Sequence, residues 1–216
     1  MSRTLTASDR NNLIRLASEL PQGSPERKAI LAGLQKVSRE VNVPGKHIQD
    51  RAKVSGAAVV SGAAVVSGNA VVSGKARVAE RSRVFGKAKV YGYAVVAGNA
   101  VVRDNAEVRN DAKVEGNAVV RGHAVVADKA VVAGRATVGD NATVGGNAFV
   151  FGNAVVSDNA TVGGNAVVRD RAIVEGDAQV TGKARIGGDA VILGGKWDGS
   201  EGEITTGRWK APGVPA

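Results

Sequence analysis

Apolar residues recur along most of this chain with a period of six. Between Gln49 and Ile192 the sequence divides into 24 hexapeptides without insertion or deletion. The sixth residue is Val in 22 of them and Ile in two, and the fourth is Ala in all but one, where Ser82 stands. Two residues separated by one other point to the same side of an extended strand. The pattern therefore predicts very short strands that each bury one Ala and one Val, with the fifth residue pointing outward.

The second and third residues of each hexapeptide are turn formers. The second is Gly in sixteen repeats and Asp in six, and the third is Asn in nine. Because Gly and Asn adopt positive φ at low cost, these positions predict a corner between successive strands, with Asn141 and His123 as third-position residues in left-handed backbone. A strand and a corner every six residues describe a coiling parallel sheet. One coil cannot bury its own apolar edge, so successive coils must stack.

The motif Val-x-Gly-Asn-Ala-x-Val, as in residues 66–72, resembles the hexapeptide-repeat left-handed β-helix family. The resemblance extends over residues 49–192 and is greatest to uncharacterised YdcK-like bacterial and phage proteins. It implies an all-β solenoid, a left-handed parallel β-helix with three hexapeptides per coil. The 24 hexapeptides would then form about eight coils in which residues i and i+18 stack.

Residues 1–40 follow a helical period instead. Thr6–Asp9 is a capping box, and Ser24, Pro25 and Glu26 form the N-cap, first position and acidic first turn of a second helix. The segment therefore predicts an αα-hairpin, followed by a lead-in at 41–48. Two interpretations remain open: a lid on the first coil, or an adaptor that docks on another protein. The apolar residues that would dock are Leu13, Leu16, Leu20, Ile30 and Leu34.

The hexapeptide register ends after Ile192. Continuing the count would place Lys196 where Ala belongs, and both tryptophans of the chain, Trp197 and Trp209, fall in the segment 193–216. A solenoid needs a cover over its last coil to prevent end-to-end association. We therefore interpret this segment as a C-terminal cap rather than as an aromatic ligand-binding site.

Stacking of residues i and i+18 sorts the outward fifth residues into three faces. The third face, from residue 65 to residue 191, is apolar at six of its eight positions. An apolar strip along a rod is a candidate contact with another protein, and the family resemblance suggests a homotrimer. Outward aromatic residues add further candidate contacts. The predicted interface residues are Val65, Val101, Val119, Val155, Ile173, Val191, Phe85, Phe149 and Phe151.

Few residues could perform chemistry. The chain has no Cys, which excludes disulfides and thiolate sites, and it has two histidines, His47 and His123. Acyltransferases of the resembled family use a His at a subunit interface, so His123 is the candidate if the chain is such an enzyme. No insertion interrupts the repeats to shape an acceptor pocket, however, and the three-His zinc site of the γ-class carbonic anhydrases cannot be assembled from one solenoid His per chain. We predict no cofactor and no metal.

The formal charge of +9 does not by itself indicate a partner. In the repeats, charges of both signs are interspersed, which is typical of a solvated surface, so nucleic acid is not an expected partner. No membrane span or signal peptide is evident, so we expect a soluble protein, cytoplasmic or virion-associated. The sequence favours a non-enzymatic structural or protein-interaction rod, such as a phage component, with a hexapeptide acyltransferase acting at a subunit interface as the alternative.

Overall fold

The computed structural model describes Ser24, Lys28 and residues 47–215. The chain divides into two units, Met1–Asn42 and Val43–Ala216. The predicted helical hairpin, with its docking residues Leu13, Leu16, Leu20, Ile30 and Leu34, lies outside the described residues apart from two positions. Lys28 is helical, and its N–H donates to the Ser24 carbonyl at 3.0 Å, which agrees with a helix that begins after Ser24.

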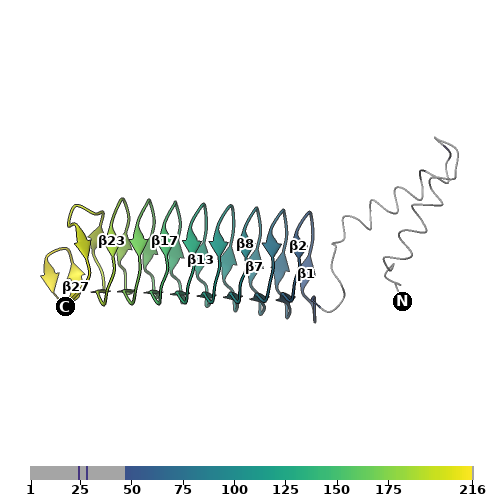
Figure 1. Ribbon diagram of the computed structural model, residues 1–216, viewed down its shortest axis with the longest axis horizontal. Helices are drawn as coiled ribbons and strands as arrows, with labels where there is room; N and C mark the ends of the chain where they lie inside the picture. Colours follow the sequence, from purple (N-terminus) through teal and green to yellow (C-terminus); the bar gives the residue numbers. More distant parts are fainter. Residues whose placement is uncertain (1–23, 25–27, 29–46, 216) are drawn as a thin grey trace. The chain divides into compact units, whose positions relative to one another are not determined.

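The second unit is a parallel β-solenoid of about nine turns (Figure 1). Each hexapeptide contributes one strand of two residues, and every third strand pairs in parallel within one of three sheets. The pairing joins equivalent residues of successive coils, as in Val119 with Thr137. The predicted strands, their parallel pairing and their stacking are therefore confirmed.

The strands belong to three sheets that we call first, second and third. The first sheet consists of β1 (Lys53–Val54), β4 (Val71–Val72), β7 (Lys89–Val90), β10 (Glu107–Val108), β13 (Val125–Val126), β16 (Thr143–Val144), β19 (Thr161–Val162), β22 (Gln179–Val180) and β25 (Lys196–Trp197). The second consists of β2 (Val59–Val60), β5 (Arg77–Val78), β8 (Val95–Val96), β11 (Lys113–Val114), β14 (Val131–Val132), β17 (Phe149–Val150), β20 (Val167–Val168), β23 (Arg185–Ile186) and β26 (Glu203–Ile204). The third consists of β3 (Val65–Val66), β6 (Arg83–Val84), β9 (Val101–Val102), β12 (Val119–Val120), β15 (Thr137–Val138), β18 (Val155–Val156), β21 (Ile173–Val174), β24 (Val191–Ile192), β27 (Arg208–Ala211) and β28 (Val214–Pro215).

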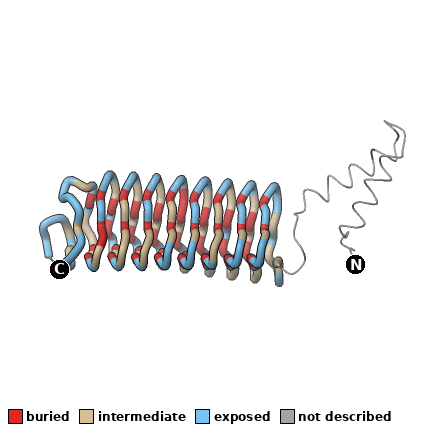
Figure 2. Tube along the Cα trace, in the orientation of Figure 1, coloured by how far each residue is buried: buried red, intermediate tan, exposed pale blue. Residues whose placement is uncertain are grey.

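The core is a column of small side chains inside the coils. The residues that contribute them recur as buried segments in every coil of Figure 2. Ala118 and Val120, the fourth and sixth residues of one hexapeptide, are both fully buried, while Val119 between them is half-buried on the outside. Ser82 replaces Ala at one fourth position, and its hydroxyl donates to the Ala79 carbonyl at 2.7 Å. The inward and outward assignments made from the repeat are correct.

The corners differ from the prediction in one respect. Within the hexapeptides, positive φ occurs at the second residue and not at the third. Gly116, with φ of 71°, is an example, and a Cβ atom there would lie 3.0 Å from the backbone of Gly134 in the next coil. Asn141 and His123 therefore do not adopt the left-handed backbone expected of them. The positive φ that the corner requires is supplied by the preceding, second residue of each hexapeptide.

Aspartate at the second position ties adjacent coils together. The carboxylate of Asp128 accepts the backbone N–H of Gly146 at 2.9 Å, and Asp50, Asp104, Asp158 and Asp170 each accept the N–H of the equivalent glycine in the next coil. At Asp140 the equivalent residue of the next coil is another aspartate, and that bond is not made. These aspartates are structural corner residues, as the sequence indicated.

The segment after Ile192 continues the solenoid by a further turn, which the hexapeptide count did not predict. β25 and β27 pair with the preceding strands of their sheets at a spacing shorter by one than in the repeats, whereas β26 keeps the repeat spacing. The shortened spacing places Lys196 outward and Trp197 inward, where it is 1% exposed opposite Val180. β28 then pairs antiparallel with β27 at the end of the third sheet. The cap is therefore a ninth coil closed by a hairpin.

Candidate interaction surface

Each sheet presents an outer column of fifth-position side chains. On the third sheet this column has no charged residue over six consecutive coils, from Val101 to Val191. The corresponding column of the first sheet contains only two apolar residues, and that of the second is interrupted by Arg77, Lys113 and Arg185. The third sheet therefore has the longest uncharged strip on the described surface. Its members, in coil order, are Val101, Val119, Thr137, Val155, Ile173 and Val191.

A second column lies beside the first on every face, made by the first residue of the following hexapeptide. Phe151 packs against Phe149 in this way, with ring centroids 5.9 Å apart in an edge-to-face arrangement. Tyr91 likewise donates to the Glu107 carboxylate of the first sheet at 3.1 Å. The sequence-based prediction of contacts took only Phe85 and Phe151 from this column, although alternation along an extended chain implies the whole of it.

The structure separates the predicted interface residues into two groups. The valines and Ile173 share the outside of the third sheet, but Arg83 lies between Val65 and Val101 in that column. Phe85 lies beside Arg83, whose guanidinium is 5.3 Å from the ring centroid. Phe149 and Phe151 belong to the second face instead. There Phe149 is 42% exposed between Val131 and Val167 in the neighbouring coils, so it forms a separate apolar patch.

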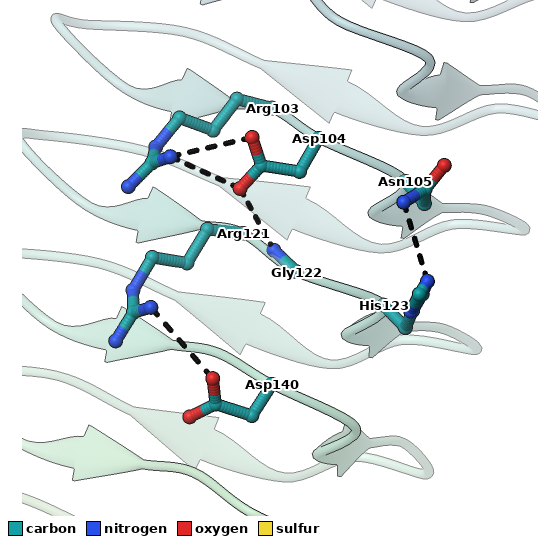
Figure 3. A network of polar contacts seen from close by, with 7 residues as sticks. All are labelled: Arg103, Asp104, Asn105, Arg121, Gly122, His123 and Asp140. Atoms are coloured by element: carbon teal, nitrogen blue, oxygen red, sulfur yellow. Dashed lines mark hydrogen bonds and ion pairs between the residues drawn. The ribbon is translucent and has the colours of Figure 1, made fainter.

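The polar residues beside the uncharged strip are held against the surface (Figure 3). Arg103 donates to the carboxylate of Asp104 at 3.0 Å, and Asp104 accepts the N–H of Gly122 in the next coil at 3.2 Å. Arg121, one coil later, lies 3.7 Å from a carboxylate oxygen of Asp140. Two of the cations next to the strip are thus already partnered within the chain.

His123 lies in the same region, at an exposed corner (Figure 3). Its Nε2 is 3.2 Å from the Nδ2 of Asn105, which is stacked on it from the preceding coil. The side chain is therefore part of a ladder of corner residues, like Asn141 on Asn159. The structure brings no carboxylate to hydrogen-bond distance of the imidazole among the described residues, and such a carboxylate is what would orient a catalytic base.

The first face contains a compact network of ionisable groups. The ammonium of Lys89 lies 3.0 Å from a carboxylate oxygen of Glu107, the residue stacked on it in the next coil. The hydrogen bond from Lys89 lowers the pKa of Glu107, and the same bond raises the pKa of Lys89. Partial burial, followed by the charge of Glu107, raises the pKa of Tyr91. At neutral pH Lys89 and Glu107 therefore stay charged and Tyr91 stays neutral. The network holds these side chains in place and has no group that titrates near neutral pH.

The hollow at the C-terminal end is lined by Trp197, Glu203, Ile204 and Trp209. The two indole rings meet edge to face with centroids 6.5 Å apart. Each indole N–H donates to a nearby backbone carbonyl, that of Gly194 for Trp197 and that of Thr206 for Trp209. The polar atoms of both rings are thus used internally, which is the arrangement of a structural cap.

Among residues 47–215 and the two described positions before them, no group of three or more His, Asp or Glu could hold a metal ion. No helix in that part of the chain is long and apolar enough to cross a membrane. The fold defines a parallel β-solenoid built from hexapeptide repeats. Comparisons of the chain with protein-family models, curated proteins and solved structures find no match.

Proposed function

We propose that this chain is a non-enzymatic rod that acts through protein–protein contacts, and that the outer face of its third sheet binds other copies of the chain. The family resemblance would make the assembly a trimer. A phage or virion component is the setting that we favour for such a rod, with the N-terminal segment as an adaptor.

The observation that supports this proposal is the uncharged strip from Val101 to Val191. Coils stack about 4.8 Å apart, so six coils give a strip about 24 Å long. The six side chains of the strip are half-buried in the single chain. A contiguous strip of such side chains on the outside of a protein, bordered by polar groups, marks an interaction site. β-sheet propensity favours Val at any outward strand position, but it would enrich all three faces equally. The first face, with only Val71 and Val125 in its outer column, shows that propensity alone does not explain the strip.

The small residues next to the strip favour a close contact. Gly139 and Ser157 occupy the adjoining column beside Thr137 and Val155. Gly139 is covered by the guanidinium of Arg121, since a Cβ atom at that glycine would lie 3.3 Å from the Arg121 Cζ. The guanidinium that covers Gly139 is itself paired with Asp140. The centre of the face is thus without free charge, so a flat partner such as another copy of this face can approach it.

The experiment is the double substitution Val119→Lys with Val155→Lys. Both side chains point outward, so the core is unaffected, and two buried unpaired charges would prevent association. We expect size-exclusion chromatography with light scattering to give an oligomer for the wild type and a single-chain mass for the variant. The matched control is Val125→Lys with Thr161→Lys on the first face, which should keep the wild-type mass. A monomeric wild type, or a Val119/Val155 variant of unchanged mass, would contradict the proposal.

A further inference from the structure

Charge is divided unequally along the solenoid. Residues 47–138 contain fourteen Lys and Arg against seven Asp and Glu, whereas residues 139–215 contain seven against nine. Both halves contain charges of both signs, but the N-terminal half of the solenoid has an excess of seven positive charges, and the C-terminal half an excess of two negative charges. A polyanion would be attracted to the first half and not to the second.

The positive charge includes one continuous row of side chains. Every second residue from 81 to 93 points outward, because the residues between them are buried or occupy the positive-φ corners. All seven outward positions in this stretch are cationic or aromatic. We call them the cation–aromatic row: Arg81, Arg83, Phe85, Lys87, Lys89, Tyr91 and Tyr93.

The cations of the row are largely available. Arg81, Arg83, Lys87 and Lys89 are exposed, and of the four only Lys89 has a carboxylate oxygen within 4.0 Å among the described residues. In the neighbouring coils the positions stacked on them hold Ala63, Val65, Asn69 and Asn105 among other uncharged residues, with Glu107 as the exception. Arg81, Arg83 and Lys87 thus differ from Arg103 and Arg169, which are each paired with the adjacent aspartate.

One aromatic residue lies between the two pairs of cations in the row, and two follow them. Tyr93 is 57% exposed, with the Lys75 ammonium 4.9 Å from its ring centroid. Phe85 is half-buried between Arg83 and Lys87 in the row. Rings beside a track of cations are the arrangement by which proteins bind single strands: the cations neutralise phosphates, and unpaired bases stack on the rings. A duplex keeps its bases stacked on one another and could use only the cations.

We infer that the cation–aromatic row is a binding site for single-stranded nucleic acid. The strand runs across the rod, along the coil, with phosphates on Arg81, Arg83, Lys87 and Lys89 and bases on Phe85, Tyr91 and Tyr93. The row shares no residue with the strip from Val101 to Val191, although Arg83 stacks on Val101 at the end of that strip.

The test is fluorescence anisotropy with a labelled 20-nucleotide oligothymidylate over a range of salt concentrations. The test variant combines Arg81→Asn, Arg83→Val, Lys87→Asn and Lys89→Val, because the same residues occur at these hexapeptide positions in neighbouring coils. The control variant removes four charges elsewhere in the same half: Lys53→Val, Lys113→Val, Lys129→Asn and Arg135→Asn. The unfolding midpoint of each variant reports whether the fold is intact.

The wild type should bind with a dissociation constant of about 1–100 µM at moderate salt, as sequence-independent binding does. The row variant should bind at least about tenfold more weakly, and its logarithmic salt dependence should be smaller by about 3, since each lost phosphate contact on a single strand removes about 0.7. Equal weakening in the control variant, or no salt-dependent binding by the wild type, would overturn the inference.

A second variant tests the aromatic part. Phe85→Ser, Tyr91→Ser and Tyr93→Asn together leave the charge unchanged. The wild type should prefer the oligothymidylate over a duplex of equal length, and this variant should lose that preference. If the wild type binds heparin or duplex as tightly as the single strand, the row is a general polyanion site and the inference for single strands is wrong.

Discussion

The 24 hexapeptides and the ninth coil adopt the same backbone course with different sequences. In the repeats, Ala and Val fill the interior and each coil consists of three hexapeptides. In the ninth coil, Trp197, Ile204 and Trp209 stand opposite Val180, Ile186 and Ile192, and two of the three spacings are shorter by one than in the repeats. The earlier coil therefore acts as a template: its free strand edge fixes where the next strand pairs, even where the repeat is lost.

The repeat coils and the ninth coil differ in the number of neighbouring coils on which they must pack. A repeat coil must present the same interior on both of its sides, which restricts it to small side chains. The ninth coil has a neighbour on one side only, so it can use two large rings to cover the interior of the coil before it. β28 then turns back on β27 and pairs with part of an edge that would otherwise be free.

The largest effect should follow from removing the cap. Trp197→Ala deletes a fully buried ring and should destabilise the ninth coil by about 3–5 kcal/mol, the usual cost for a buried Trp. Because each coil contacts only its neighbours, we expect loss of amide-exchange protection in residues 193–215 while the repeats stay protected. The same substitution at Trp209, which is only half-buried, should have a smaller effect. Uniform loss of protection over the whole rod would show that the coils are not independent in this way.

The next effect concerns the interior of a repeat coil. Ala118→Leu adds volume at a fully buried position and should lower the free energy of unfolding by about 3 kcal/mol, since overpacking is costly where stacked coils cannot move apart. Val119→Leu, at the next position and pointing outward, is the control and should cost far less. Chemical denaturation of both variants checks the prediction, and equal stability would mean that the fourth position does not limit the interior.

The corners should respond at the second residue rather than the third. Gly116→Val forces a β-branched residue into positive φ and against the Gly134 backbone, and should cost about 1–3 kcal/mol. Asn117→Val alters the adjacent third position, where φ is not positive, and should cost less. Thermal unfolding of the two variants compares these positions directly. A larger loss at Asn117 would instead support the corner geometry predicted from sequence.

The smallest effect should come from the carboxylates that join coils. The N–H of Gly146, followed by the side-chain amide of Asn110, lowers the pKa of Asp128. A carboxylate whose pKa is lower in the folded than in the unfolded chain stabilises the folded protein at any pH above the unfolded-state pKa, which is about 3.9 for Asp. This stabilisation is lost as the pH falls through the pKa of the folded state. Asp128→Asn should therefore reduce the decline in stability below about pH 4. The measurement is the urea midpoint of unfolding from neutral to strongly acidic pH, with Asp111→Asn, at an exposed third position, as the control. If Asp128→Asn leaves the acid dependence of the midpoint unchanged, the bond between Asp128 and Gly146 does not stabilise the fold.

The repeat allowed the sheets, their register and the direction of nearly every solenoid side chain to be predicted, because alternation and stacking leave few options. The ninth coil was missed because Lys196 was counted at a fixed spacing of six, whereas the corner before it is shorter by one. Positive φ was assigned to both corner residues because Gly and Asn each tolerate it, and composition cannot say which residue bears it.

The surface was predicted less completely. The fifth-position strip from Val101 to Val191 was predicted, but of the adjoining column only the aromatic residues were, and the contact of Phe151 with Phe149 was not. The row from Arg81 to Tyr93 was missed because charge was averaged over the solenoid. The signal was nevertheless present in the sequence, since alternation places Arg83, Phe85 and Lys87 side by side.

The most direct test of the proposed interface uses the absence of cysteine from the chain. Val119→Cys, Val125→Cys and Val131→Cys place one thiol on each of the three faces, at the fifth positions of consecutive hexapeptides in the third, first and second sheets respectively. The measurement is the rate of thiol labelling at a concentration where the wild type is an oligomer. We predict that Cys at 119 on the third sheet is labelled much more slowly than at 125 or 131, and that dilution or the Val155→Lys substitution removes the difference. Equal labelling on all three faces would contradict an interface on the third sheet.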